Sequence, residues 1–462
     1  QIDDMQENEI YIGTIIEMGD KFLAENHEQF VQRYQSIDPD DYANISYTSG
    51  TTADPKGILL THRNYTANVA QGASVISIDR GDIMLIILPM DHCFAHVAGL
   101  YTMMSYGGSI ATVPGKTPQA QLRNIIPTMK EIKPQVMLTV PAISRSFKKA
   151  IENGVKAKGK TTEKLYNMAL KNARAYYKDY YNQGGAQFWR KPFVKLFDKI
   201  IFSKIRETFG GKMKFCVGGG ALLDIELQRY FCAIGMPTFQ GYGLSEATPI
   251  ICSNAPGFAR FGSSGRIVSP MECTIRDDEN RILPNGQTGE IVIKGENVMA
   301  GYWKNPEATA ETIVDGWLHT GDRGYICKED PRYLYVTGRF KSLLISSDGE
   351  KYSPEGYEDN LAVVSKYIDN VILHNNQSPY TIVLVVPNKE ALRAAAPGDK
   401  EAQLRLIQAD VDSYRKGGIR AGRFPEKRLP TAIVVCEEPF TEKHGLVNST
   451  GAVARGKVAK HF

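Results

Sequence analysis

Short apolar runs alternate with stretches of helical pattern through the first half of this chain. The runs lie at residues 83–88, 109–113, 136–140 and 214–217. Such alternation is typical of βαβ units, in which helices bury both faces of a parallel sheet. The 462 residues are enough for two or three domains with a large core. We therefore predict an α/β fold built on a parallel sheet.

The sequence pattern changes at about residue 262. Short alternating strands, separated by turns such as Pro284-Asn-Gly286, predict a small antiparallel, β-barrel-like section over residues 262–336. A smaller mixed α+β pattern follows. We therefore expect residues 1–338 to form a large N-terminal domain and residues 339–462 to form a smaller, mobile C-terminal domain.

Composition excludes several classes of protein. Charge is nearly balanced, with 55 Lys+Arg against 51 Asp+Glu, which argues against a nucleic-acid binder. Seven scattered cysteines without a C-x-x-C pair indicate a reducing compartment rather than a disulfide framework or a zinc site. No apolar run approaches the ~20 residues of a membrane span, and the first ten residues do not resemble a signal peptide. We expect a cytoplasmic protein.

Residues 47–57 form a loop that combines hydroxyl groups, glycines and one lysine, with the sequence Tyr-Thr-Ser-Gly-Thr-Thr-Ala-Asp-Pro-Lys-Gly. Gly50 allows close approach of the backbone to a ligand, hydroxyl groups can donate to phosphate oxygens, and Lys56 adds positive charge. The spacing differs from that of a Walker P-loop. The hydroxyl residues are Thr48, Ser49, Thr51 and Thr52.

Further motifs follow this loop in a fixed order. They are Gly218-Gly-Gly-Ala221, Tyr242-Gly-Leu-Ser-Glu246, Asp315-Gly-Trp-Leu-His-Thr-Gly-Asp322, and Gly338-Arg-Phe-Lys341 leading to Gly349-Glu350. Together they resemble the adenylate-forming enzymes, which include acyl-CoA synthetases, luciferases and peptide-synthetase adenylation domains. The resemblance extends from about residue 45 to the end of the sequence. Because the family usually has a longer segment before the loop, we expect the N-terminal domain to lack its first part.

The resemblance implies a reaction in two halves. A carboxylate attacks the α-phosphate of ATP to give acyl-AMP and pyrophosphate, and the thiol of coenzyme A then displaces AMP. Attack of one anion on another needs charge neutralisation, which Mg²⁺, backbone N–H groups and lysines can supply. We therefore expect ATP, Mg²⁺ and coenzyme A as cofactors and a fatty acid as substrate.

The resemblance also assigns roles around the nucleotide. Thr48 and Glu246 would flank the magnesium ion, which prefers oxygen ligands. Tyr242 would stack on adenine, Asp322 would accept hydrogen bonds from the ribose hydroxyls, and Arg339 would reach the same sugar. Further contacts to the nucleotide would come from Gly219, Gly220, Ala221, Gly241, Gly243 and Ser245.

Three more residues receive roles away from the nucleotide. His92 would line the pocket for the substrate carboxylate. Lys341 would be the hinge about which the C-terminal domain rotates between the two half-reactions. Gly349 would approach the pantetheine arm of coenzyme A, where a glycine allows close backbone contact.

One position departs from the family pattern. The family has a lysine near the C-terminus that reaches the carboxylate and the α-phosphate, and this position falls on Ala452. Arg455 and Lys457 follow shortly after it. Slow adenylation with retained thioester formation is therefore expected. Two alternatives stay open: transfer of the acyl group to a carrier protein or another acceptor, and a nucleotide- or acyl-binding pseudoenzyme.

Residues 144–214 have a helical pattern and a large excess of positive charge, with 18 lysines and arginines against 5 acidic residues. They form either a solvated surface or a basic face near anionic lipid or the phosphates of coenzyme A. A long helical insert at this place resembles the long-chain fatty-acid–CoA ligase branch of the family. Peripheral contact with a membrane surface is therefore considered, and the oligomeric state stays open.

Overall fold

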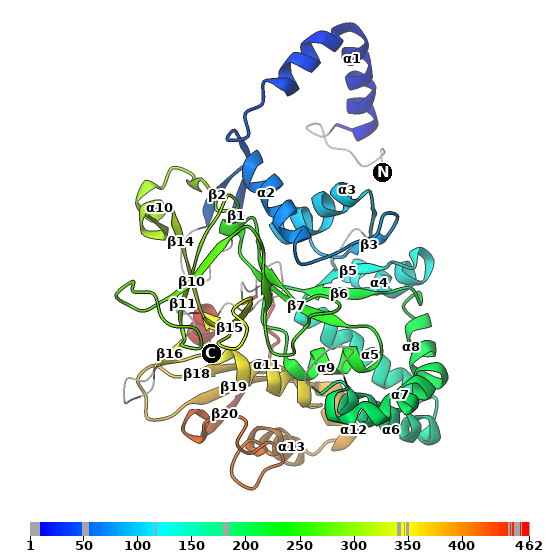
Figure 1. Ribbon diagram of the computed structural model, residues 1–462. Helices are drawn as coiled ribbons and strands as arrows, with labels where there is room; N and C mark the ends of the chain where they lie inside the picture. The colour runs from blue at the N-terminus through cyan, green and yellow to red at the C-terminus, as the bar shows by residue number, and fades with distance from the viewer. Residues whose placement is uncertain are drawn as a thin grey trace.

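The protein is an α/β molecule built around one large mixed sheet, as the computed structural model in Figure 1 shows. The structure describes residues 10–48, 55–115, 118–178, 184–339, 343–345, 347, 351–441, 444, 446–447, 453 and 455–461.

Five short strands pair in parallel to form half of this sheet: β3 (Ile83–Ile86), β4 (Ser109–Thr112), β5 (Val136–Thr139), β6 (Phe215–Gly218) and β7 (Thr238–Gly243). Their spatial order is β4-β3-β5-β6-β7. Strands β5 and β6 are buried along their whole length, because they are apolar and helices cover the sheet. The predicted parallel sheet is confirmed. Helices of this half include α2 (His62–Ala73), the π-helix η2 (Phe94–Tyr101), α3 (Thr102–Tyr106), α4 (Pro118–Ile132) and α9 (Ile225–Ala233).

The other half of the sheet is antiparallel: β8 (Ile250–Ser253), β9 (Gly265–Ile267), β10 (Glu272–Arg276), β11 (Gly289–Lys294), β13 (Ile313–Val314), β14 (Trp317–Ile326) and β15 (Tyr333–Arg339). The path runs from β7 through β8 and β9 to β15, β14, β11 and β10, and β13 pairs with β14. The antiparallel strands predicted for residues 262–336 therefore continue the main sheet. This arrangement brings the C-terminal end of β7 near β14 and β15.

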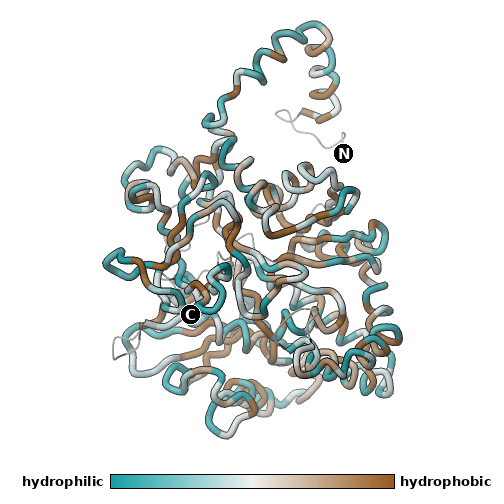
Figure 2. The backbone as a smooth tube through the Cα atoms, in the orientation of Figure 1, coloured by the Kyte–Doolittle hydropathy of each residue, from teal (hydrophilic) through white to brown (hydrophobic). Residues whose placement is uncertain are grey.

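A separate three-stranded sheet comprises β1 (Tyr42–Thr48), β2 (Lys56–Thr61) and β12 (Gly301–Tyr302). Strands β1 and β2 pair in antiparallel fashion. Helix α1 (Ile12–Gln35) precedes these strands and projects from the top of the molecule in Figure 1, with no buried residue. Apolar segments nevertheless recur along this exposed helix (Figure 2).

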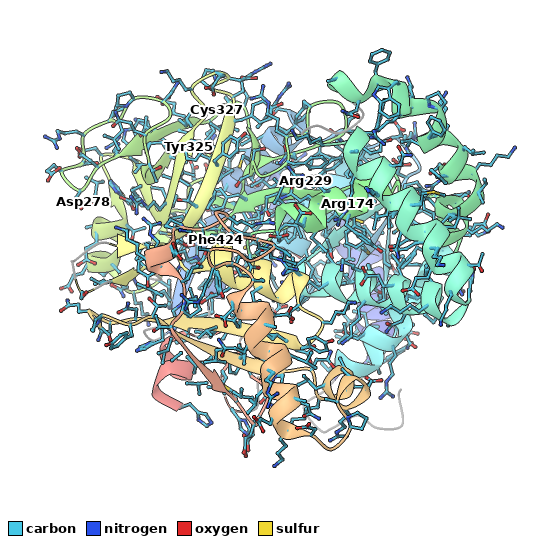
Figure 3. All side chains as sticks on the ribbon, turned by 90° about the horizontal axis from the view of Figure 1, so that it is seen from below. Arg174, Arg229, Asp278, Tyr325, Cys327 and Phe424 are labelled. Carbon is cyan, nitrogen blue, oxygen red and sulfur yellow. The ribbon has the colours of Figure 1, made fainter. Side chains whose placement is uncertain are left out.

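The basic stretch consists of helices: α5 (Pro141–Ala157), α6 (Lys160–Tyr176), the 3₁₀-helix η3 (Gly185–Arg190), α7 (Lys191–Phe197), the π-helix η4 (Asp198–Phe202) and α8 (Ser203–Glu207). Its inner side packs on α9, where the hydroxyl of Tyr166 donates to that of Tyr230 over 2.9 Å. Arg174 of α6 and Arg229 of α9 lie close together where these helices meet the rest of the molecule (Figure 3), and both pair with Glu226.

The C-terminal part has its own three-stranded sheet and hydrophobic core. Asn360 of this part donates to Asp224 of the large part over 2.9 Å. The predicted division at residues 338/339 stays a prediction. No helix in the described ranges has the length and apolarity needed to cross a bilayer. The elements are β16 (Leu344–Ile345), β17 (Lys351–Tyr352), α11 (Glu355–Val364), β18 (Ile368–His374), β19 (Ile382–Pro387), α12 (Lys389–Ala395), α13 (Lys400–Asp412), β20 (Ala432–Val435) and α14 (Arg455–His461).

Candidate active site

The loop predicted to bind phosphate lies in sequence between β1 and β2, which pair with each other. Thr48 of β1 lies opposite Lys56 of β2 in the antiparallel register. Strand β12 pairs with the other edge of β2 and places Tyr302 opposite Ile58. Of the predicted loop residues, Ser49, Gly50, Thr51 and Thr52 lie outside the described residues, as does the side chain of Thr48.

Tyr302 brings Lys56 and Glu246 together across 190 positions of sequence. The ammonium of Lys56 lies 4.7 Å from the centre of the Tyr302 ring, and the Tyr302 hydroxyl donates to Glu246 Oε1 over 3.0 Å. Glu246 belongs to the short 3₁₀-helix η5 (Ser245–Ala247), directly after β7. A cation and a carboxylate from separate motifs thus share one partner, Tyr302.

The predicted ribose-binding residues Asp322 and Arg339 form a second cluster with Tyr242, the residue predicted to stack on adenine. The hydroxyl of Tyr242 donates to Asp322 Oδ2 over 2.7 Å, and Arg339 Nε lies 3.2 Å from Asp322 Oδ1. Asp322 on β14 and Arg339 on β15 are opposite each other in the register, while Tyr242 arrives from β7. The structure therefore brings together three residues that the sequence identified independently.

Burial dominates the electrostatics of this cluster. It raises the pKa of Asp322 above its usual range, although Arg339 and the Tyr242 hydroxyl oppose the shift. Burial also raises the pKa of Glu355, near Arg339, to about 7. The site thus holds Asp322 in an environment that disfavours its charge, which a ligand with several donors can offset.

Two glycines of the predicted set are required by the backbone itself. Gly220 has a φ of +77°, in the left-handed region that L side chains avoid. A Cβ atom on Gly243 would lie 1.8 Å from the carbonyl oxygen of Pro249, so no side chain fits there. Gly219 and Gly241 line the same pocket as these two.

A largely apolar pocket opens beside these glycines, and its empty space, including its mouth, is about 770 Å³. His92 lies on its wall, and its Nδ1 accepts from the backbone N–H of Phe94 over 3.2 Å. Burial lowers the pKa of His92, which favours the neutral ring with its proton on Nε2. The apolar lining consists of Ile76, Ile78, Met84, Ala98, Val136, Leu138, Phe215, Val217, Leu244 and Ile250.

Comparison with known proteins agrees with this geometry. The AMP-binding enzyme family matches residues 3–303, well over half of the chain. The chain belongs to the AMP-binding enzyme family. Long-chain-fatty-acid–CoA ligase 5 of Rattus norvegicus is 32% identical over 442 residues, which cover 92% of this chain and 61% of the relative. A chloroplastic long-chain-fatty-acid–[acyl-carrier-protein] ligase, AEE15 of Arabidopsis thaliana, is 26% identical over 478 residues, covering 95% and 63%.

The fold of this AMP-binding enzyme is also that of solved relatives. The crystal structure of the anthranilate CoA ligase AuaEII in complex with anthranoyl-AMP superposes with a TM-score of 0.65 at 21% identity, covering 92% of this chain and 67% of the other. The chain spans less than two thirds of the length of the two curated relatives described above. These comparisons therefore establish the family and the fold.

The described residues are compatible with the predicted magnesium ion, and the roles of Thr48 and Glu246 in binding it stay a prediction. Glu246 makes no ion pair within the described part of the chain, and one of its oxygens is already oriented by Tyr302. The described part of the chain contains no group of three histidine, cysteine, aspartate or glutamate side chains that could hold a metal ion. Mg²⁺ suits such a site, because it is usually bound by one or two protein oxygens together with substrate phosphates and water.

Three further predicted positions lie outside the described residues: Lys341, Gly349 and Ala452. Arg455, three positions after Ala452, lies within the described residues. Both of its terminal nitrogens bond the carboxylate of Glu358, over 2.7 and 2.6 Å.

Sequence reasoning missed Tyr302 and Phe94. Nothing distinguishes Tyr302 from the other 22 tyrosines of the chain until β12 pairs with β2. Phe94 lies so close to Gly219 that a Cβ atom there would be 2.9 Å from its ring. The spacing of these two residues in sequence gives no signal for that contact.

Proposed function

We propose that this AMP-binding enzyme activates a long-chain fatty acid with ATP and transfers the acyl group to coenzyme A. In the first half-reaction, a carboxylate oxygen bonds to the α-phosphorus while the bond to pyrophosphate breaks. In the second, the thiol sulfur of coenzyme A bonds to the acyl carbon. AMP leaves with the electron pair of the C–O bond, and the thiol proton is released.

The apolar pocket beside the ribose cluster carries this proposal. None of its lining residues is a lysine, arginine or carboxylate, so the ammonium group of an amino acid would find no ionic partner there. An alkyl chain, by contrast, gains about 0.8 kcal/mol for each CH₂ that it buries. His92, Gly219 and Tyr242 line this pocket together with the apolar residues, which suits a substrate with a carboxylate head and an apolar tail.

In the first half-reaction, each of the side chains described above would bind a different part of the substrates. Asp322 and Arg339 would hold the ribose, Lys56 and the loop would hold the phosphates, and the Nε2–H of neutral His92 would donate to the substrate carboxylate. Glu246, with Thr48, would hold Mg²⁺, which neutralises phosphate charge when bound. The side chains thereby orient the carboxylate and the nucleotide and need not move a proton.

A second candidate function is transfer of the acyl group to a carrier protein. The similarity to the Arabidopsis ligase named for an acyl-carrier-protein favours it. A pseudoenzyme that binds nucleotide or acyl chain is the third candidate, motivated by Ala452. Incubation of supplied acyl-AMP with coenzyme A or with carrier protein separates the three, because only the matching acceptor forms a thioester and a pseudoenzyme forms none.

A panel of carboxylates from acetate to palmitate, with one amino acid, tests the substrate by pyrophosphate release. Catalytic efficiency should rise by up to about fourfold for each added CH₂ until the pocket is full. Preference for acetate or for the amino acid would refute the fatty-acid assignment.

The cytoplasm is the proposed location. All seven cysteines are free thiols, and most are buried, as expected in a reducing compartment.

A further inference from the structure

An apolar stripe lies exposed along η3, α7 and η4, at the lower right edge of the molecule in Figure 1. Its last four members are separated by four, three and four residues, which places them on one side of successive helical turns. The core-facing side of the same helices is formed by other residues, since Val194, Phe197 and Ile201 are each no more than 8% exposed. The stripe consists of Phe188 (73% exposed), Trp189 (50%), Phe193 (48%), Leu196 (51%) and Ile200 (41%).

Lysines accompany this stripe. Lys191, Lys195 and Lys199 recur every four residues, are exposed, and make no ion pair with any described residue. Asp198 is the single acidic residue between positions 184 and 206. Both of its oxygens are bonded by Arg206, at 2.5 and 2.9 Å, so it does not offset the lysines.

The combination of exposed apolar residues with lysines indicates what kind of partner this surface binds. The centre of a protein–protein interface is depleted in lysine, because an unpaired ammonium is costly to desolvate. At a membrane surface, apolar and aromatic side chains enter the boundary between headgroups and acyl chains, while lysines extend to the lipid phosphates. The guanidinium of Arg190 lies 4.2 Å from the ring centre of Trp189, so this aromatic residue already carries a cation beside it.

We propose that the stripe and its three lysines dock the protein on the surface of membranes that contain anionic phospholipids. This inference goes beyond the proposed function, since adenylation requires no membrane. It also has a consequence for that function: long-chain fatty acids partition into bilayers, so docking would raise their concentration near the apolar pocket.

Sedimentation with vesicles tests the proposal. The protein should bind phosphatidylcholine vesicles that contain phosphatidylglycerol far more strongly than pure phosphatidylcholine vesicles. Each lysine should contribute roughly fivefold in partitioning, so the K191Q/K195Q/K199Q variant should bind on the order of 100-fold more weakly. The control variant K328Q/K400Q/K416Q removes the same charge from exposed lysines elsewhere and should bind like the parent protein.

The apolar contribution is tested by Phe193→Glu against Ile419→Glu, a residue that is 87% exposed but outside the stripe. Only Phe193→Glu should abolish binding. Trp189 is one of three tryptophans, and its insertion should shift fluorescence to the blue on vesicle addition. That shift should disappear in Trp189→Phe.

Three results would overturn the proposal: no vesicle binding by the parent protein, equal binding by the two lysine triple variants, or a dimer in solution that Phe193→Glu dissociates while vesicle binding is unchanged. The last result would make the stripe an interface between two copies. Pyrophosphate release with a short, water-soluble carboxylate should be the same in all variants, so failure of docking is distinguishable from failure of the proposed function.

Discussion

Replacement of Asp322 by asparagine should separate two effects of this carboxylate: its effect on the free energy of unfolding and its contribution to nucleotide binding. Asp322 is 5% exposed and has two partners, the Tyr242 hydroxyl at 2.7 Å and Arg339 at 3.2 Å. Burial nevertheless raises its pKa, which means that desolvation outweighs both partners. In the absence of ligand, the charged form is therefore a net cost to folding.

The direction in which stability changes with pH follows from proton linkage. A carboxyl group whose pKa is higher in the folded chain than in the unfolded chain lowers the free energy of unfolding as pH rises through the interval between the two values. For Asp322 this interval begins at the unfolded value of about 4. The cost is thus absent in acid and increases as pH rises from about 4 through the folded pKa. Asp322→Asn should match the parent melting temperature in acid and equal or exceed it at neutral pH.

Nucleotide binding should change in the opposite direction. A hydrogen bond to a charged acceptor contributes about 1.5–3 kcal/mol, so loss of the charge should weaken AMP binding roughly 10- to 150-fold. Calorimetric titration with AMP and melting curves across pH provide the two measurements. Asp278→Asn, at an exposed site labelled in Figure 3, is the matched control and should change neither. A lower melting temperature at neutral pH together with unchanged AMP affinity would refute the reasoning.

The remaining predictions concern the two half-reactions. Glu246→Gln should keep the fold but slow pyrophosphate release by about 10²–10³, because an amide cannot offset the charge of the metal; an unchanged rate would remove Glu246 from the metal site. Lys341→Pro should lock the hinge by fixing φ and impair one half-reaction far more than the other, whereas equal loss in both would contradict the hinge. Ala452→Lys should accelerate adenylation by lowering its activation free energy, by up to several kcal/mol if the site excludes water. It should leave thioester formation from supplied acyl-AMP nearly unchanged. High adenylation activity in the parent chain would contradict this last expectation.

Local sequence patterns predicted the parts of the site that depend on local geometry. Gly243 was identified within its motif, and a Cβ atom there would lie 1.8 Å from the Pro249 carbonyl oxygen, which explains why a glycine stands there. Asp322 and Arg339 were identified separately, and the register of β14 and β15 brings them together. The apolar runs became β-strands because four to six apolar residues between helices suit a buried parallel sheet.

Contacts between distant segments could not be predicted in the same way. Tyr302 reaches Glu246 only because β12 adds to the edge of β2, more than 240 positions earlier in the chain. The pocket lining likewise collects ordinary apolar residues from β3, β5, β6 and the helices around them. No residue type or spacing distinguishes these from the rest of the core, so only the folded chain identifies them.

The environment of Arg455 bears on whether this neighbouring cation replaces the family lysine that is absent at Ala452. A neighbouring cation could replace the family lysine only if it were free to reach the active site. Arg455 forms a two-point pair with Glu358, at 2.7 and 2.6 Å, and donates to the carbonyl of Leu373 over 2.8 Å. The side chains of the pair are 22% and 10% exposed, so separating them would leave a largely buried carboxylate unpaired. Arg455 therefore holds α14 against α11, and Arg455→Ala should destabilise the C-terminal part and impair both half-reactions. Selective loss of adenylation in that variant would show instead that Arg455 acts in place of the lysine.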